Sequence, residues 1–328
     1  MSAAFEHDPV MVDEIVAVFE PVPAGVIVDG TLGGGGHAGA LLAARDDVTV
    51  LGLDRDPDAI AAATGRLSSF GDRVVTHRCR FDELDDALVA HGVAELSGAL
   101  FDLGVSSPQL DRAERGFSYR HDGPLDMRMD TDAPWSADDV VNGYPEAELA
   151  AVIRRYGDER FSRRIAAAIV GARPLESTTQ LAAVVTAAIP AAARRTGGHP
   201  AKRTFQAIRI EVNGELDAIG TAVDRAVDAL RPGGRIAVLA YHSGEDRIVK
   251  RHLRVAETGG CECPVELPCV CGAVRTVRLV RAPKRPSVGE RDRNRRAASA
   301  RLRVAEKLDV GHPDPESDPD SNDHPEVD

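Results

Sequence analysis

Short apolar runs alternate with amphipathic segments in the first third of the chain, and this alternation constrains the fold more than any other feature. Buried strands are predicted at four apolar runs, Val26–Val28, Val48–Leu53, Val74–His77 and Ala99–Leu103. Helices are predicted between or before them, at residues 10–19, 37–44 and 57–67, the last with Asp56 as its N-cap. This order favours an α/β fold with a parallel, doubly wound (Rossmann-like) sheet.

The alternation stops after residue 104, where the composition becomes helical. Ala-rich helices are predicted over residues 136–193, and further helices at residues 205–210 and 215–230. A turn at residues 231–234 then leads into a buried strand, Arg235–Tyr241, and a last strand is expected at Val274–Val280. The simplest architecture is a discontinuous sheet domain, residues 1–108 and 200–307, with an all-helical insertion at residues 109–199. We expect residues 308–328, acidic and rich in proline, to be disordered.

A glycine-rich loop, residues 30–36, follows the first predicted strand. It contains four consecutive glycines and precedes a predicted helix, and Asp54 closes the second strand. Glycines let a ligand approach the backbone, and an acid at the end of the second strand typically binds ribose hydroxyls. The pattern therefore predicts a nucleoside-containing cofactor. A dinucleotide fits the glycine spacing nominally; an acid before the loop, Asp29, favours S-adenosylmethionine because it suits that molecule's amino-acid part.

A long polar segment, residues 102–130, follows the fourth predicted strand. Ligands of open α/β sheets bind at the carboxyl ends of the strands, so this segment is expected to form an active-site wall. Its arginines, Arg112, Arg115, Arg120 and Arg128, could hold phosphates, or could pair with the nearby acids Asp111, Glu114, Asp122 and Asp126. Its aromatic residues Phe117 and Tyr119, and Tyr241 beyond it, could stack on a base or belong to the core.

The charge of the chain is unevenly distributed. The formal net charge is −12, but residues 309–328 carry eight acids and no Lys or Arg, so the rest of the chain has 44 acids against 40 bases. Basic residues gather at residues 275–307, and again at Arg194, Arg195, Lys202, Arg203 and Arg209. Such clusters suit a phosphate backbone, although either could be a solvated face.

The motifs taken together resemble one family. The strings VDGTLGGGGHAG, LDRDPDAI, FDLGVSSPQLDRAERGFSYRHDGPLDMRMD, RTFQAIRIEVNGEL and HSGEDRIVK occur in this order between about Phe5 and Arg303. They resemble the bacterial 16S rRNA cytosine-N4 methyltransferase family. The resemblance implies a class I S-adenosylmethionine-dependent methyltransferase fold with a helical insertion. It also implies S-adenosylmethionine as the methyl donor, and a cytosine of the decoding region of 16S rRNA, in the small ribosomal subunit, as the acceptor.

The resemblance also implies which residues bind the cofactor. The positions that match are Gly35, Gly36, His37, Asp54, Phe81, Asp102 and Gln109. Asp102 is in addition the candidate catalytic residue, because an acceptor beside the cytosine amine would localise its lone pair and receive its proton; the alternative is that Asp102 only lines the cofactor site. Ser106 and Ser107 are expected where the base enters. The chain departs from the family at Gly34, and at Tyr241 and Gly244, where the family commonly has Phe and Leu.

The string HSGEDR places His242 beside Ser243, which could suggest a nucleophilic serine. Methyl transfer from a sulfonium, however, needs no covalent enzyme intermediate. We therefore interpret Ser243, with Asp246 three residues later, as a helix N-cap box, and leave open whether His242 faces the substrate.

Four of the cysteines are close enough in the sequence to be candidate metal ligands. Cys261, Cys263, Cys269 and Cys271 form two C-x-C pairs, which could hold a structural zinc ion, although C-x2-C is the usual spacing. Reduced cysteines in a loop are the alternative, and no metal is assigned to the active site.

Other function classes are weaker. A DNA or other RNA methyltransferase commonly has Pro-Pro-aromatic after the fourth strand, where this chain has Leu103-Gly104-Val105. A non-catalytic binding module leaves the complete cofactor motifs unexplained, and a dehydrogenase leaves the 102–130 segment unexplained. With no signal-like N-terminus and no membrane-spanning run, we expect a cytoplasmic protein. The sequence implies no protein partner, and a homodimer stays open.

Overall fold

One mixed sheet organises the protein. The computed structural model describes residues 9–194, 198–264, 270–294 and 297–309. In this part of the chain seven strands lie in the order β3-β2-β1-β4-β5-β7-β6. Strands β1 to β5 pair in parallel, whereas β7 is antiparallel to both β5 and β6. The strands are β1 (Gly25–Asp29), β2 (Val48–Asp54), β3 (Val74–Arg78), β4 (Leu96–Asp102), β5 (Leu230–Ala240), β6 (Val277–Leu279) and β7 (Arg301–Lys307).

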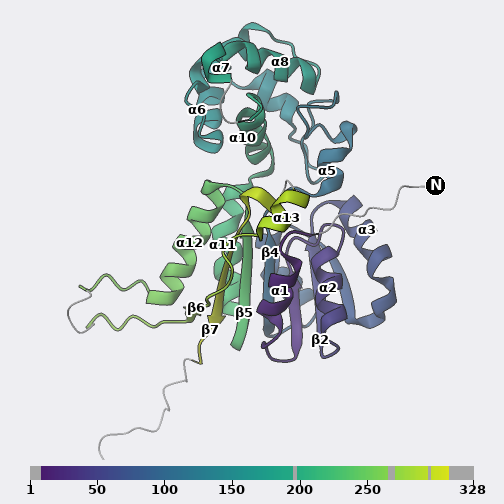
Figure 1. Cartoon of the computed structure of the whole chain (residues 1–328), viewed down its shortest axis with the longest axis vertical. Helices are drawn as coiled ribbons and strands as arrows, with labels where there is room; N and C mark the ends of the chain where they lie inside the picture. The colour runs from purple at the N-terminus through teal and green to yellow at the C-terminus, as the bar shows by residue number, and fades with distance from the viewer. Residues whose placement is uncertain (1–8, 195–197, 265–269, 295–296, 310–328) are drawn as a thin grey trace, which may run out of the picture.

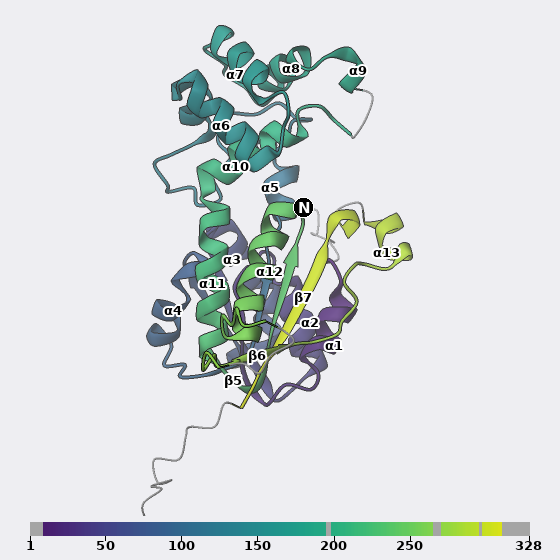
Figure 2. The same ribbon diagram turned by 90° about the vertical axis from the view of Figure 1, so that its left-hand side faces the viewer.

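Helices cover both faces of the sheet, which confirms the α/β class (Figures 1 and 2). One face carries α1 (Val12–Phe19), α2 (Gly36–Ala44) and α3 (Pro57–Leu67). The other face carries α4 (Leu84–Ala90), α11 (Glu215–Ala229) and α12 (Ser243–Thr258). Because both faces are buried, β4 is apolar on both sides: Phe101 packs toward α11, and Leu100 packs toward α1.

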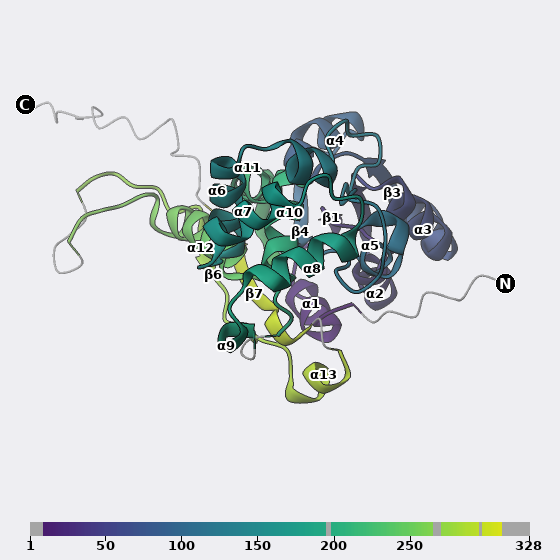
Figure 3. The ribbon, with the colours of Figure 1, turned by 90° about the horizontal axis from the view of Figure 1, so that it is seen from above.

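A helical unit lies beyond the carboxyl ends of the parallel strands (Figures 1 and 3). It contains α5 (Ser107–Asp111), α6 (Glu146–Gly157), α7 (Ser162–Gly171), α8 (Thr178–Ala188), α9 (Ala191–Arg194) and α10 (Lys202–Asn213). Its apolar core is separate from the cores of the sheet and includes Ile153, Ile165 and Val185. The same core contains Phe205 and Ile208 of α10, so α10, which we expected on the sheet side of a boundary at residue 199, packs with the insertion.

Four elements differ from the sequence prediction. β7 was not predicted, because its apolar residues alternate with Arg301, Arg303 and Glu306, a pattern that suits an antiparallel strand near the sheet edge. β5 begins at Leu230, earlier than expected: the predicted turn at 231–234 is an irregularity inside the strand, opposite a single β4 residue. The strand expected at 274–280 is shorter, at Val277–Leu279, and α4 was missed.

Within the described part of the chain, no helix is both long enough and apolar enough to cross a membrane. The predicted disordered tail lies almost wholly outside the described residues, which end at Asp309.

Candidate active site

A cavity of about 930 Å³ lies between the carboxyl ends of the strands and the helical unit. It sits where β1 is flanked by β2 on one side and β4 on the other, so the chain connections diverge there. Such switch points are the usual ligand sites of doubly wound sheets, and the volume suits a cofactor-sized molecule. The glycine loop, the ends of β2 and β4, the 102–130 segment and α10 all contribute to its lining.

The glycine loop bends tightly along one side of this cavity. Gly35 has a φ of +74°, and a Cβ there would lie 2.9 Å from Leu67 of α3. Gly34 has no heavy atom within 4 Å of the corresponding position and lines the cavity, as does Gly36. The backbone of the loop is therefore open to a ligand at Gly34, whereas Gly35, which does not line the cavity, makes the turn.

Asp54 fixes the glycine loop against the end of β2. Its Oδ2 accepts a hydrogen bond from the Gly33 backbone N–H (2.9 Å), and its Oδ1 accepts one from the Asp56 N–H (2.9 Å). Burial raises the pKa of this carboxyl. Each carboxylate oxygen has a second acceptor site, so Asp54, which lines the cavity, can still accept from hydroxyl groups.

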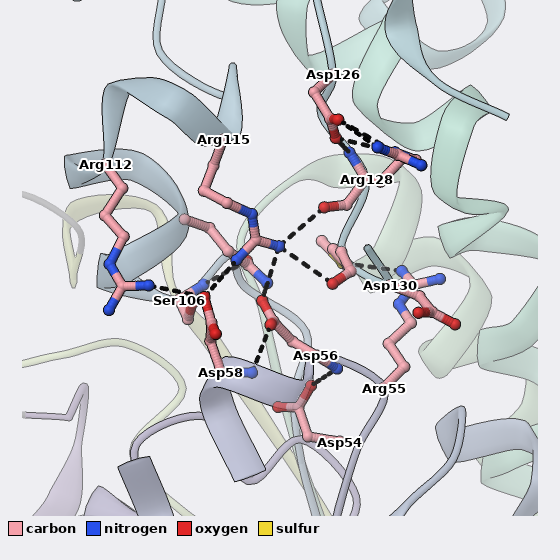
Figure 4. Close-up of polar contacts among 12 residues, drawn as sticks. Asp54, Arg55, Asp56, Asp58, Ser106, Arg112, Arg115, Asp126, Arg128 and Asp130 are labelled. Carbon is pink, nitrogen blue, oxygen red and sulfur yellow. Dashed lines mark hydrogen bonds and ion pairs between the residues drawn. The ribbon is translucent and has the colours of Figure 1, made fainter. Parts of the chain in front are cut away.

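Asp56 connects the start of α3 to the 102–130 segment (Figure 4). Its Oδ1 caps α3 by accepting from the Asp58 N–H, as predicted. Its Oδ2 accepts from Gln109 Nε2 and from Arg115 Nη2, both at 3.0 Å. Gln109 Oε1 in turn accepts from the Ser106 N–H (3.0 Å), so Gln109 lines the cavity but its amide also holds the wall in place.

Asp102, the last residue of β4, lines the cavity with a carboxylate that is only partly satisfied. Its N–H donates to Thr31 Oγ1 (2.6 Å), and its Oδ2 lies 3.8 Å from Nδ1 of His37. Its Oδ1 is buried and has no hydrogen-bond partner among the described residues. A buried acceptor without a donor is costly, so this oxygen is suited to receive a donor from a bound ligand. His37 itself is buried, with Nε2 2.9 Å from the Val10 carbonyl oxygen.

Phe81 and Asp29 were both expected beside the cofactor, but of the two only Phe81 lines the cavity. Phe81 lines the cavity from the 3₁₀ turn after β3 and packs edge-to-face on Phe101, with the ring centroids 6.0 Å apart. Asp29, expected to face the cofactor, is instead 1% exposed and is not among the lining residues. Its Oδ1 accepts from the Thr31 N–H, and burial raises its pKa to about 7. It therefore supports the loop from beneath.

Three of the four arginines of the 102–130 segment form ion pairs, whereas Arg120 lies over the Tyr119 ring, 5.7 Å from its centroid. Arg112 pairs with Asp58 (2.7 Å), and Arg115 pairs with Asp56. Arg128 pairs with Asp126 (2.7 Å), the only one of these partners that the sequence suggested (Figure 4). Partners more than fifty residues away could not be recognised by spacing.

The aromatic candidates divide between core and cavity. Phe117 is 5% exposed, although it reaches the cavity lining. Tyr119 stacks on His199, with centroids 4.5 Å apart, and also lines the cavity. Tyr241 lies against Gly104, where an added Cβ would be 2.9 Å from its ring, and burial and the charge of Asp102 raise the pKa of its hydroxyl well above the ordinary value.

The helical unit contributes residues that the sequence did not place in the site. Lys202, Phe205 and Gln206 of α10 line the cavity opposite the glycine loop. Asn213, at the end of α10, donates to the Met127 carbonyl and accepts from the Met129 N–H (2.8 Å). Residue spacing gives no signal for these contacts, because they depend on how the insertion folds back.

His242, and not Ser243, caps α12. His242 Nδ1 accepts from the backbone N–H groups of Gly244 (3.1 Å) and Glu245 (3.4 Å). Glu245 Oε2 accepts from the Tyr241 and His242 N–H groups, which completes a capping box one residue earlier than predicted. Ser243 is exposed, and Asp246 instead pairs with Arg301 and Arg303 of β7.

The fold is that of a class I methyltransferase, and the cavity beside the glycine loop has the position and volume for a cofactor. The chain belongs to the MraW methylase family, whose model matches residues 4–308. It is 52% identical over 320 residues to the ribosomal RNA small subunit methyltransferase H of Mycobacterium sp. (strain KMS), covering 94% of this chain and 86% of that protein.

The protein of the same name from Heliobacterium modesticaldum is 49% identical over 313 residues, covering 93% of this chain and 99% of that protein. Among solved structures, an rRNA methylase from Streptococcus thermophilus matches at 14% identity with a TM-score of 0.37, over 90% of this chain and 93% of that one. The family assignment rests on the sequence relatives. The enzyme is therefore an S-adenosylmethionine-dependent methyltransferase, and the dehydrogenase alternative is excluded.

The cavity fits S-adenosylmethionine on three observations. The backbone is open at Gly34, Asp54 keeps acceptor sites beyond its two backbone bonds, and Asp102 has a buried oxygen that lacks a donor. A cofactor with ribose hydroxyls and an ammonium group supplies the donors that these carboxylates lack.

Proposed function

We propose that this enzyme methylates the exocyclic N4 of a cytosine in the decoding region of 16S rRNA, within the small ribosomal subunit in the cytoplasm. The names of the relatives support small-subunit rRNA as the substrate. The observation that supports the choice of an amine is the buried Asp102 Oδ1, which has no partner among the described residues and has two acceptor sites, so that it can receive the cytosine amine as well as the cofactor's ammonium group. An exocyclic amine has two N–H groups to offer, whereas a ring carbon has none.

In this proposal Gly35, Gly36, His37, Asp54, Phe81, Asp102 and Gln109 form the cofactor site. Asp54 accepts from the ribose, and Phe81 packs beside the adenine. His37 lies beside the Asp102 carboxylate, with its Nδ1 3.8 Å from Oδ2. Gly35 and Gln109 keep the walls of the site in position. Gly35 makes the turn of the glycine loop, and the Gln109 amide forms hydrogen bonds with both Ser106 and Asp56.

S-adenosylmethionine, when bound, supplies an activated methyl group on its sulfonium sulfur. Transfer of this methyl group needs no covalent intermediate with the enzyme. Asp102 accepts a hydrogen bond from the cytosine amine, which localises the nitrogen lone pair that the ring otherwise delocalises. Transfer to the amine nitrogen would leave the donor as a neutral thioether, and Asp102 would take the amine proton. The cavity walls would hold the amine in a fixed orientation, which lowers the entropic barrier.

The helical unit, with the 102–130 segment leading into it, forms the RNA-facing side in this proposal. Lys202 and Tyr119 line the cavity from that side and offer a cation and a stacking surface. A base that is modified by an enzyme is normally taken out of its stack, and the open space between the two units accommodates it.

The substrate is tested by incubating the enzyme with labelled S-adenosylmethionine and either small subunits, naked rRNA or DNA, followed by nucleoside analysis. We expect label in N4-methylcytidine from the small subunit. Label confined to DNA, or present as a ring-carbon methyl, contradicts the proposal.

The role of Asp102 is tested by Asp102→Asn, which keeps the shape and removes the charge. We expect the methylation rate at saturating cofactor to fall about 100-fold or more, because a general base contributes that much. Cofactor affinity, measured by calorimetry on the same variant, is expected to change far less. If affinity falls instead and the saturated rate is unchanged, Asp102 only positions the donor.

A further inference from the structure

The segment between α12 and β6 projects from the body of the protein as a long loop (Figures 1 and 3). We call its outgoing part, from residue 259, and its returning part, up to residue 276, the two legs of the loop. Its described residues, 259–264 and 270–276, form no helix or strand. Val270 is 89% exposed and Val274 is 60% exposed, so these apolar side chains do not build a core for the loop. A segment of this length without a core or a backbone ladder needs another source of order.

Contacts at the base close the loop. The Thr276 N–H donates to the Ala256 carbonyl oxygen (2.9 Å), and a Cβ on Gly259 would lie 2.5 Å from the Val274 carbonyl oxygen. The two legs therefore approach each other closely at Gly259, which has a φ of +64°. These contacts fix the base and bring the next residues of the two legs opposite each other.

Three thiols converge just beyond this base. The Sγ atoms of Cys261, Cys263 and Cys271 all lie within 4.8 Å of one another. A tetrahedral zinc ion with Zn–S bonds of about 2.3 Å places its sulfur ligands about 3.8 Å apart, so small side-chain shifts would complete the coordination. Cys79 is half-buried beside the sheet and does not belong to this cluster. Cys269 lies outside the described residues.

We propose that Cys261, Cys263 and Cys271 form a structural zinc site that orders this loop. Soft thiolates select zinc over the hard cations, and binding displaces their protons. Three thiolates and Zn²⁺ together carry one negative charge, and a further donor completes the tetrahedron. The site is far in sequence from the glycine loop and is independent of the proposed rRNA substrate, so its test does not depend on methylation.

The first test measures metal in the full chain, purified under reductant without chelator. We expect about one equivalent of zinc per chain by mass spectrometry of the metals. Cys263→Ser and Cys271→Ser should each reduce it to a small fraction of an equivalent. Cys79→Ser is the matched control and should retain the metal.

A second test keeps the proposal falsifiable if a variant is poorly folded. Wild-type protein loaded with Co²⁺ should show a thiolate-to-metal charge-transfer band, and trypsin cleavage after the exposed Arg275 should be several-fold faster once a chelator removes the metal. The proposal is overturned if the wild type holds well under a tenth of an equivalent even after incubation with zinc. It is also overturned if both loop variants retain the metal, or if two of the three cysteines are disulfide-bonded under reductant.

Discussion

At the scale of single residues, neighbouring glycines in the same loop have different roles. Gly35→Ala places a Cβ 2.9 Å from Leu67 on a residue with a φ of +74°, so we expect it to lower the free energy of unfolding by about 1 to 3 kcal/mol. Gly34→Ala is the matched control, because its Cβ meets no atom within 4 Å. Urea denaturation of both variants measures the difference. Equal losses of stability would contradict the assignment of the turn to Gly35.

Because the pKa of Asp29 is raised in the folded chain, we expect the free energy of unfolding to depend on pH. This pKa is raised from 3.8 to about 7, chiefly by burial, so the folded chain holds this proton more tightly than the unfolded chain does. The resulting stabilisation is fully present below a pH of about 4 and is lost as the pH rises through about 7. Asp29→Asn keeps an acceptor for the Thr31 N–H and removes the titration.

We therefore expect Asp29→Asn to flatten the dependence of unfolding free energy on pH between about 4 and about 7, by on the order of a few kcal/mol. Urea denaturation of both proteins across that range provides the measurement. Parallel pH profiles for the variant and the parent would show that this carboxyl does not titrate with folding.

At the scale of elements, the start of α12 gives a prediction about caps. His242→Ala removes the acceptor for the Gly244 and Glu245 N–H groups, and we expect a loss of about 1 kcal/mol in unfolding free energy. Ser243→Ala should have almost no effect, because Ser243 is exposed and does not cap the helix. Chemical denaturation measures both variants. A larger loss for Ser243→Ala would restore the prediction made from sequence.

Elements with a strong local signal could be predicted, and those without one could not. α3 has Pro57 at its first turn and Asp56 as its cap, and it lies where the sequence placed it. β7 has no such signal, because its charged residues pair with distant groups: Glu306, for example, pairs with Arg235 and Arg278. Burying those charges is favourable only once the neighbouring strand is in place, which depends on the tertiary structure.

At the scale of the whole molecule, the uneven charge predicts an effect on RNA binding. Residues 310–328 carry seven acids and no Lys or Arg. Deleting them should increase the affinity for small-subunit RNA at low ionic strength, because like charges repel, and the increase should vanish at high salt. Binding titrations at several salt concentrations measure this, with thermal unfolding as the control for an intact fold. An affinity that is unchanged at low salt contradicts the prediction.

In the candidate site, too, positions that depend on nearby residues could be predicted from the sequence, whereas contacts between distant residues could not. Asp54, Phe81 and Asp102 follow strands whose carboxyl ends must meet at one sheet edge, so their convergence in the cavity was predictable. The second role of Asp56 was not, because its partners Gln109 and Arg115 are 53 and 59 residues away.

The sequence by itself determined the class of fold, the family and most of the cofactor side of the cavity, because these depend on periodicity, turn residues and motifs that are local in the chain. Only the tertiary structure decided that Asp29 is buried and that His242 caps α12. It also decided that α10 lines the cavity and that three cysteines meet near the base of the loop between α12 and β6. The physical reason is that burial, ion pairing and the convergence of thiols depend on which distant segments pack together.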